Sequence, residues 1–288
     1  MFTRINTLIF VVLILLLPVT KVLAQGLKWT NDVYGSVEDG SGTRFASSRI
    51  SVDMPWMRTY VGGEKLETDV YLEHTSFRWT GVAAAENDYF WLSVPVFYRQ
   101  KRDGNNELHL RIEPGLMSDL NSMGTESFGA NAEISGRSYL RRGGFIQYGV
   151  IVNRTFGDFK PRPLLAWATK VTHSTELLLG FPRTNLQTRW NGGLSTYARF
   201  YPDGGLWREE VKLDTGVTAT GSDISEVSYR NWRLGTGVEL QWQENIWFNA
   251  EIGQMRNRQI EARDSTAATV KATPGQNGYW GLGVLVRL

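Results

Sequence analysis

Apolar side chains recur at every second position over long stretches of this chain. In residues 230–243, for example, Trp232, Leu234 and Val238 alternate with charged residues, polar residues or glycine. Successive side chains of a β-strand point to opposite faces, so each such stretch has one apolar face and one polar face. Apolar patterns with the period of a helix are essentially missing beyond the first residues. The sequence therefore predicts an all-β fold with antiparallel strands.

The stretch 280–288 carries the same alternation to the last residue of the sequence. Trp280, Leu282 and Val284 are apolar, and Gly281 and Gly283 lie between them. A strand at the edge of a sheet leaves backbone N–H and C=O groups unpaired, and pairing with another strand satisfies them. We expect this last strand to pair with the first one, which would close the sheet into a barrel.

The first 24 residues have the features of a cleaved secretory signal. Arg4 supplies a basic start, an apolar run covers residues 8–17, and Val22-Leu23-Ala24 provides a cleavage site. The alternative is a helical membrane anchor, but the apolar run is shorter than the about 20 residues that a spanning helix needs. We therefore expect a signal peptide over residues 1–24 and a single barrel domain over residues 25–288.

Composition restricts what the mature chain can bind. Removal of the signal takes away Arg4 and Lys21, which leaves 29 basic residues against 29 acidic ones and gives no reason to expect nucleic-acid binding. The sequence has no cysteine, so disulfides and thiolate metal sites are impossible, and no motif predicts a metal or another cofactor. No later apolar run is long enough for a spanning helix, so only strands could cross a membrane.

Strand-like stretches follow one another from residue 27 onward, each roughly 10–16 residues long, which is longer than most strands of soluble sheets. They add up to about 12–14 strands of a transmembrane β-barrel, with residues 175–190 forming either one bent strand or two short ones. Short turns on one side and longer loops on the other are typical of such barrels. The expected short turns are Gly62-Gly63, Asp103-Gly104, Gly143-Gly144, Asp203-Gly204-Gly205 and 243–245, and the expected loops are 38–46, 81–88, 118–127, 220–225 and 263–276.

The two faces of the predicted strands differ in a way that indicates a membrane. Trp232 and Trp242 bracket one apolar face, as in a strand whose aromatic residues lie at both membrane interfaces. A soluble β-sandwich or a lipocalin-like barrel would also alternate, but the opposite face here carries charges of both signs, which suits an enclosed lumen. The residues predicted to line the lumen are Glu67, Asp69, Glu73, Arg99, His109, Arg111, Glu113, Lys212, Asp214, Arg233, Glu239, Glu251 and Arg287.

The last strand resembles the terminal strand signal of Gram-negative outer-membrane β-barrel proteins. Gly283, Val286 and Leu288 occupy the positions of that signal. Residues 178–183 also resemble a block of uncharacterised barrel families of this class. The resemblance implies a location in the outer membrane, contact with outer-membrane lipid and recognition by the barrel assembly machinery, and it implies no particular activity.

The charged lumen face predicts a pore or transport protein for small solutes. Glu67, Asp69 and Glu73 share one face of one strand and could attract cations. Alternatively, the charges pair with one another and fill the interior, which would give a structural or interaction barrel with a closed lumen.

A lipid-active enzyme is a third hypothesis. Such an enzyme would need a base, a nucleophile and an orienting group within hydrogen-bond reach. His109 is a candidate base on the polar face, and Ser93 or Ser135 is a candidate partner. Nothing in the sequence brings these residues together, so we predict no enzymatic activity.

Overall fold

The computed structural model describes residues 26–38, 42–62, 64–81, 86–102, 104–120, 124–141, 143–211, 223–263 and 269–287. Within them, two short 3-10 helices, η1 (Thr125–Ser127) and η2 (Arg154–Phe156), accompany the strands. No helix in these ranges is long and apolar enough to cross a membrane. The strands are β1 (Gly26–Asp32), β2 (Gly35–Ser36), β3 (Arg44–Val61), β4 (Glu64–Thr80), β5 (Glu86–Ser93), β6 (Val96–Arg102), β7 (Asn106–Ser118), β8 (Phe128–Tyr139), β9 (Phe145–Val152), β10 (Pro161–Lys170), β11 (Thr175–Phe181), β12 (Thr184–Asn191), β13 (Leu194–Val211), β14 (Asp223–Gln243), β15 (Ile246–Arg263), β16 (Thr269–Ala272) and β17 (Asn277–Val286).

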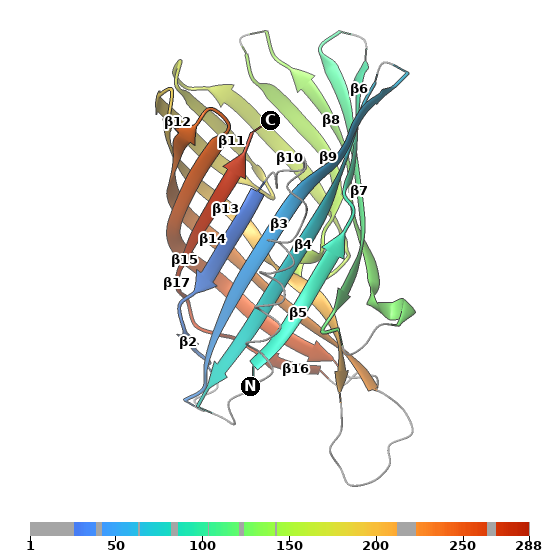
Figure 1. Cartoon of the computed structure of the whole chain (residues 1–288), viewed down its shortest axis with the longest axis vertical. Helices are drawn as coiled ribbons and strands as arrows, with labels where there is room; N and C mark the ends of the chain where they lie inside the picture. The colour runs from blue at the N-terminus through green and yellow to red at the C-terminus, as the bar shows by residue number, and fades with distance from the viewer. Residues whose placement is uncertain are drawn as a thin grey trace.

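In the described part of the chain, these segments form one closed antiparallel barrel of 14 strands (Figure 1). β1 and β2, β5 and β6, and β16 and β17 are interrupted strands that each occupy one place in the barrel. β1 pairs with β17, and Trp29 lies opposite Leu282 in that pair. The predicted all-β antiparallel barrel and the pairing of its last strand with its first are therefore confirmed.

Residues 175–190 form two antiparallel strands. β11 ends at Phe181, β12 begins at Thr184, and Leu178 lies opposite Asn185. The two strands have 7 and 8 residues, whereas β13 has 18 and β14 has 21. Because β11 and β12 stop partway along the wall, the connection 153–160 can occupy the space beside β13.

The connections differ in length between the two ends of the barrel. At one end, which we call the short-turn end, lie the connections 62–63, 103–105, 140–144, 171–174, 192–193 and 244–245. This is the upper end in Figure 1, where β17 also ends. Four of the five predicted short turns fall here. The described parts of the predicted longer loops fall at the opposite end, which we call the loop end, and strands extend several residues into them.

The predicted turn at Asp203-Gly204-Gly205 is wrong, because these residues lie inside β13. A Cβ atom on Gly204 would be 2.1 Å from the carbonyl oxygen of Tyr229 and 2.8 Å from that of Thr155. Glycine is therefore required for the close approach of two neighbouring backbones, not for a reversal of the chain. Most of the strand predicted over residues 210–217 lies outside the described residues.

The outer face of the barrel is apolar over a broad band. On β14, for example, Leu234 and Leu240 are 52% and 54% exposed. Exposed apolar side chains on so many strands suit contact with lipid rather than with water. Other exposed members of this band are Leu92, Ile112, Ile134, Tyr148, Val150, Leu165, Leu179, Leu186, Val238, Trp242, Ile252 and Leu282.

The barrel narrows toward the loop end. There β13 contacts the end of β7, with Arg208 opposite Ser118 in a parallel pair and the Asp119 N–H donating to the Arg208 carbonyl over 3.2 Å. Elsewhere in the sheet, β8 to β12 lie between β7 and β13. Where β7 and β13 contact each other directly, the closed ring of strands therefore does not include β8 to β12. A ring of fewer strands has a narrower interior, which side chains can fill.

Aromatic side chains fill the narrow half of the lumen. Phe77 lies at the centre of the set, with ring centroids 5.2 Å from Phe45, 5.1 Å from Tyr89, 5.4 Å from Trp207 and 5.6 Å from Tyr229. These rings come from five strands, so they join walls that are far apart in the sequence. We define the aromatic core as Val37, Phe45, Phe77, Tyr89, Trp91, Met117, Leu206, Trp207, Val227, Tyr229 and Ile260.

Candidate functional site

A layer of buried ion pairs crosses the barrel next to the aromatic core. Arg233 lies 2.7 Å from Asp32 and 2.9 Å from Asp203, and Asp203 lies 2.6 Å from Arg49. Arg49 continues the chain of charges to Glu73 at 3.6 Å. We define the ion-pair layer as Asp32, Arg49, Glu73, Arg154, Asp203, Arg233 and Arg258.

The layer spans the lumen because its members come from two separate parts of the sheet, β1 to β4 on one side and β13 and β14 on the other. Asp32 is on β1, Glu73 on β4, Asp203 on β13 and Arg233 on β14. Charges taken out of water are tolerated when they are paired and hydrogen-bonded. Tyr229 adds such a bond, because its hydroxyl donates to Asp32 over 3.1 Å. The pairing therefore allows a charged layer to lie directly against an aromatic one.

Arg154 connects the ion-pair layer to the aromatic core. It belongs to η2, in the connection beside β13, and its Nη2 donates to Glu73 over 2.6 Å. Its guanidinium lies 4.7 Å from the ring centroid of Trp91 and 5.5 Å from that of Trp207. Cation–π attraction operates at such distances. A connecting segment from the wall thus places a cation in the lumen.

The lumen holds a cavity toward the short-turn end. This cavity has a volume of about 200 Å³, and Arg99, His109 and Arg111 are among the residues that line it. Its charges are paired locally, since His109 Nε2 lies 3.0 Å from Glu107 and Arg111 lies 2.6 Å from Glu113. The short-turn half is therefore polar and contains space, in contrast to the aromatic half.

A second polar cluster surrounds Glu251 on the inner wall. The Tyr197 and Tyr201 hydroxyls donate to this carboxylate over 3.0 and 2.9 Å, Tyr279 also donates to it, and Arg199 forms an ion pair with it. The donors come from β13 and β17, on either side of β14 and β15 in the sheet. This cluster satisfies a buried carboxylate entirely with protein groups.

The predicted lumen residues occupy several different environments. Glu73 and Arg233 belong to the ion-pair layer, and Glu251 to its own cluster. Glu113 accepts from Trp91 Nε1 over 3.0 Å. The remaining described residues are placed as follows: Glu67, Arg99, His109 and Arg111 line the 200 Å³ cavity, Asp69 lies 2.6 Å from Arg58, and Arg287 lies 2.7 Å from Glu239. Lys212 and Asp214 lie outside the described residues.

Sequence reasoning missed most of the ion-pair layer. Asp32 lies on a first strand whose alternation is weak, Asp203 was assigned to a turn, and Arg154 lies in a connection. Arg49 precedes the alternating Ile50 and Val52, so the period-two pattern could have placed it on a polar face, whereas Arg258 is flanked by the polar Asn257 and Gln259 and shows no such pattern. No local pattern indicates that these five residues meet.

The proposed assembly signal lies on and beyond the last strand. A Cβ on Gly283 would be 3.0 Å from the carbonyl oxygen of Leu27 on β1, so glycine permits close packing where the barrel closes. Val286 is the last residue of β17. Leu288 lies outside the described residues, and recognition by the assembly machinery stays a prediction.

The candidate catalytic residues are engaged elsewhere in the described structure. Ser135 lies opposite His109 in the β7–β8 pair, but its hydroxyl donates to Glu133 over 2.9 Å. The Ser93 hydroxyl donates to Glu113 over 2.9 Å. Neither serine forms a hydrogen bond with His109 among the described contacts, so this geometry gives no support to a serine nucleophile with a histidine base.

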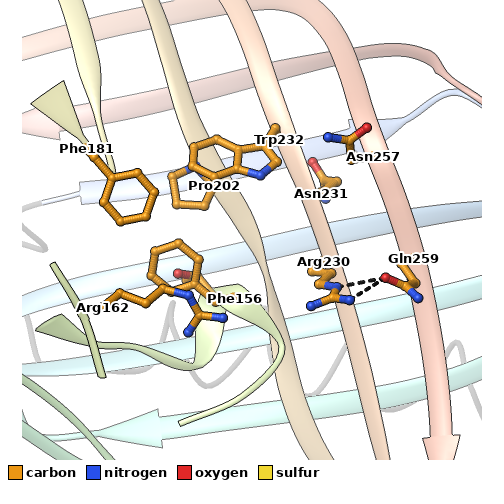
Figure 2. A pocket seen from close by; sticks show the side chains of 10 residues that line it. Phe156, Arg162, Phe181, Pro202, Arg230, Asn231, Trp232, Asn257 and Gln259 are labelled. Atoms are coloured by element: carbon orange, nitrogen blue, oxygen red, sulfur yellow. Dashed lines mark hydrogen bonds between the residues drawn. The ribbon is translucent and has the colours of Figure 1, made fainter. Parts of the chain in front are cut away.

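A pocket of about 320 Å³ opens in the wall where β11 and β12 stop, and we call it the wall pocket (Figure 2). Figure 2 shows aromatic rings and Arg162 on one side of it, and amide groups and Arg230 on the other. Sequence reasoning missed it because its residues come from six separate elements. Its lining residues are Thr155, Phe156, Arg162, Phe181, Pro202, Arg230, Asn231, Trp232, Asn257 and Gln259.

The two guanidiniums of the wall pocket have different electrostatic surroundings. Arg162 pairs with Asp158 in the adjacent connection at 2.6 Å. Partial burial opposes ionisation of Asp158, but hydrogen bonds from Arg162 and from the Lys160 N–H hold the pKa of this carboxyl below its ordinary value. Arg230 instead donates to the neutral Gln259 amide oxygen over 3.0 Å, and its closest carboxylate, Glu261, lies 3.7 Å away.

The closed antiparallel barrel, its apolar outer band and its charged interior define a β-barrel of the outer-membrane type. No family model matches the chain, and no curated protein matches it.

Two solved structures are similar to parts of this architecture. The beta domain of the Bordetella autotransporter BrkA is 12% identical, with 92% of this chain and 100% of that chain covered, at a TM-score of 0.34. Pseudomonas aeruginosa OccK5 (OpdH) is 10% identical, with 91% of this chain and 98% of that chain covered, at a TM-score of 0.27. Likenesses at these scores carry no information about function, which depends on the geometry described above.

Proposed function

We propose that this chain is an outer-membrane barrel whose lumen is closed at rest, so that it presents binding surfaces instead of an open pore. The observation that carries the proposal is the aromatic core, which fills the half of the lumen where β7 contacts β13. The ion-pair layer lies across the lumen on the short-turn side of this core. A solute that entered from the short-turn end would meet both barriers in succession.

Opening such a lumen by thermal motion is costly. Arg154 would have to leave Glu73 and the faces of Trp91 and Trp207 before a passage formed beside η2. Separating a buried ion pair without providing water or a new partner is strongly unfavourable. The closed state is therefore expected to be dominant unless a ligand or partner stabilises another arrangement.

Conductance across a planar lipid bilayer tests the proposal. The purified full chain is expected to give no steady conductance, because the aromatic core and the ion-pair layer both lie across the described lumen. A variant that combines Glu73→Ala and Arg154→Ala with Phe77→Ala and Trp207→Ala removes the central pair and opens the aromatic core, and it is expected to produce current. The double variant Glu176→Ala, Arg189→Ala removes an exposed pair and serves as the control. Steady current through the unmodified chain would overturn the proposal.

Transport of small solutes, as the sequence predicts, is the second candidate function. The polar cavity of about 200 Å³ at the short-turn end favours it, since such a space could hold a small solute. Under this alternative the core would move aside during transport. Uptake of a small sugar into liposomes that contain the unmodified chain, above the rate of protein-free liposomes, would favour transport over the closed barrel.

Location in the outer membrane is part of the same proposal. The apolar band on the outer face supports this location, because a protein dissolved in water rarely exposes so many aliphatic and aromatic residues. Contact with outer-membrane lipid and insertion by the assembly machinery, through Gly283 and its neighbours, follow from that location. Reaction of outward-facing cysteines with a membrane-soluble reagent would test the placement.

A further inference from the structure

The wall pocket lies at the edge of the apolar band, on the outside of the barrel. Trp232, which lines the pocket, also stacks on outward-facing Phe200 at 4.8 Å, and Leu234 beside it is exposed in the apolar band. Tryptophan concentrates at the level of lipid headgroups, where one part of the ring meets acyl chains and the other meets water. A ligand in this pocket would therefore lie at headgroup depth, next to the lipid.

One side of the pocket is an aromatic surface. Phe181 lies 6.0 Å from both Phe156 and Trp232, and the Arg162 guanidinium lies 4.3 Å from the centroid of Phe156 (Figure 2). The rings come from β11, η2 and β14, and they meet only because β11 stops at Phe181. A flat apolar ring face of this kind suits the C–H face of a sugar or the first part of an acyl chain.

The other side of the pocket is built from amides. Asn231 is 2% exposed and its side chain lies toward Asp203, so this residue forms the buried back of the pocket. Asn257 and Gln259 complete this side. Amide groups can donate and accept hydrogen bonds at the same time, which is what vicinal hydroxyl groups require.

A β-bulge presents Asn257 and Gln259 to the outside. The β14–β15 register shifts between Arg230 and Trp232, and Asn257 in the bulge has a left-handed φ of 52°. Because of the extra residue, Asn257 and Gln259 line the outer pocket while Arg258 between them is buried in the ion-pair layer. Bulges commonly redirect side chains at functional sites, and left-handed backbone is uncommon outside glycine.

Arg230 gives the pocket its preference for anions. Asp158 pairs with Arg162 at 2.6 Å, whereas Arg230 donates to the uncharged Gln259. Its carboxylate neighbour Glu261 lies 3.7 Å away and is shared with Arg263 and Lys271, so this group of side chains keeps an excess of positive charge. An arginine with a neutral partner is suited to bind a phosphate oxygen through charge-assisted hydrogen bonds. The pocket thus combines a stacking surface, sugar-type hydrogen-bond groups and one cation that is available for a phosphate.

We propose that the wall pocket binds the phosphorylated sugar headgroup of a membrane lipid, with the acyl chains lying along the apolar band beside Phe200 and Leu234. A soluble sugar phosphate has the same headgroup chemistry, but the position of the pocket beside the lipid-facing surface favours a lipid. This inference goes beyond the closed lumen, because the pocket is on the outer wall and needs no passage through the barrel.

Native mass spectrometry of the full chain from phosphatidylcholine nanodiscs, with and without added lipid A as the probe, tests the proposal. Lipid A is a phosphorylated disaccharide lipid and is expected to stay bound to the unmodified chain. Arg230→Gln and Trp232→Ala are each expected to lower its occupancy about tenfold, the effect of losing one charge-assisted hydrogen bond or one stacking surface. Arg263→Gln on β15 and Trp242→Ala on β14 lie outside the pocket and are the matched controls.

The alternative outcomes are distinct. Equal retention of lipid A by all variants would overturn the site, and the controls would show whether any loss is general. Soluble glucosamine 1-phosphate is titrated in a second arm, with tryptophan fluorescence as the readout. Saturation by this compound at concentrations at which lipid A is not retained would overturn the membrane source. Unchanged heat-dependent gel mobility of each variant shows that the barrel has folded.

Discussion

Asp32→Ala is expected to lower the free energy of unfolding by about 3–5 kcal/mol, the usual result of leaving one half of a buried ion pair without its partner. Asp32 lies 2.7 Å from Arg233 and 3.9 Å from Arg258, and it accepts hydrogen bonds from Ser47 and Tyr229. Alanine would leave two buried guanidiniums with less compensation. Urea unfolding in detergent micelles, followed by tryptophan fluorescence, measures the loss.

An exposed ion pair provides the control for Asp32. Glu176 lies 3.9 Å from Arg189, and their side chains are 51% and 66% exposed. Pairs of this kind typically contribute about 0–1 kcal/mol, so Glu176→Ala is expected to have little effect. Equal losses for the two variants would mean that water reaches Asp32, which would contradict a sealed ion-pair layer.

Trp207→Ala is expected to cost about 3–5 kcal/mol of stability, as is typical when a buried aromatic side chain is truncated and leaves a cavity. Trp207 is 0% exposed, and it contacts Phe77, Tyr89 and the guanidinium of Arg154. Its removal deletes packing on three sides of the aromatic core. The same unfolding experiment measures the effect.

Trp242→Ala is the matched control, because Trp242 is 65% exposed on the outer face. The truncated side chain is identical, but lipid or detergent can fill the space it leaves. A clearly smaller loss is therefore expected. If the free energy of unfolding fell equally in both tryptophan variants, Trp207 would not be part of a packed core. Water would then have to fill the lumen near the loop end.

The strands and their faces could be predicted from the sequence because they depend on local order. Alternation around Leu234 and Leu240 on β14 fixes which side chains share a face, and any closed sheet must place one face outside. The glycine pair Gly143-Gly144 is predicted as a turn for the same local reason, and both residues have a positive φ. The pairing of β1 with β17 followed from the need of a terminal strand for a partner.

The Asp203-Gly204-Gly205 segment shows where local reasoning fails. The same residue types form turns elsewhere in the chain. At positions 203–205 they instead allow the connection 153–160 to pack closely against β13. A sequence shows where glycine allows unusual backbone geometry, but it does not show whether that glycine serves a chain reversal or a close approach of two backbones. The two uses differ only in what lies beside the backbone, which is a property of the folded barrel.

The closed lumen and the wall pocket could not be predicted for a similar reason. The lumen is closed by contact between β7 and β13, whose residues Ser118 and Arg208 are far apart in the sequence. The pocket depends on where β11 ends and on the bulge at Asn257. The charged residues were recognised individually, but their partners across the lumen depend on barrel diameter, which alternation does not determine.

Thiol reactivity along β14 in membranes tests the central claim most directly, since the native chain has no cysteine. Single cysteines at Val227, Leu240 and Gln241 probe the aromatic core, the lipid-facing band and the short-turn half of the lumen. We predict that a water-soluble thiol reagent reacts with Gln241→Cys but not with Val227→Cys, and that Leu240→Cys reacts only with a membrane-soluble one. Reaction of Val227→Cys with the water-soluble reagent as fast as that of Gln241→Cys would contradict the sealed lumen.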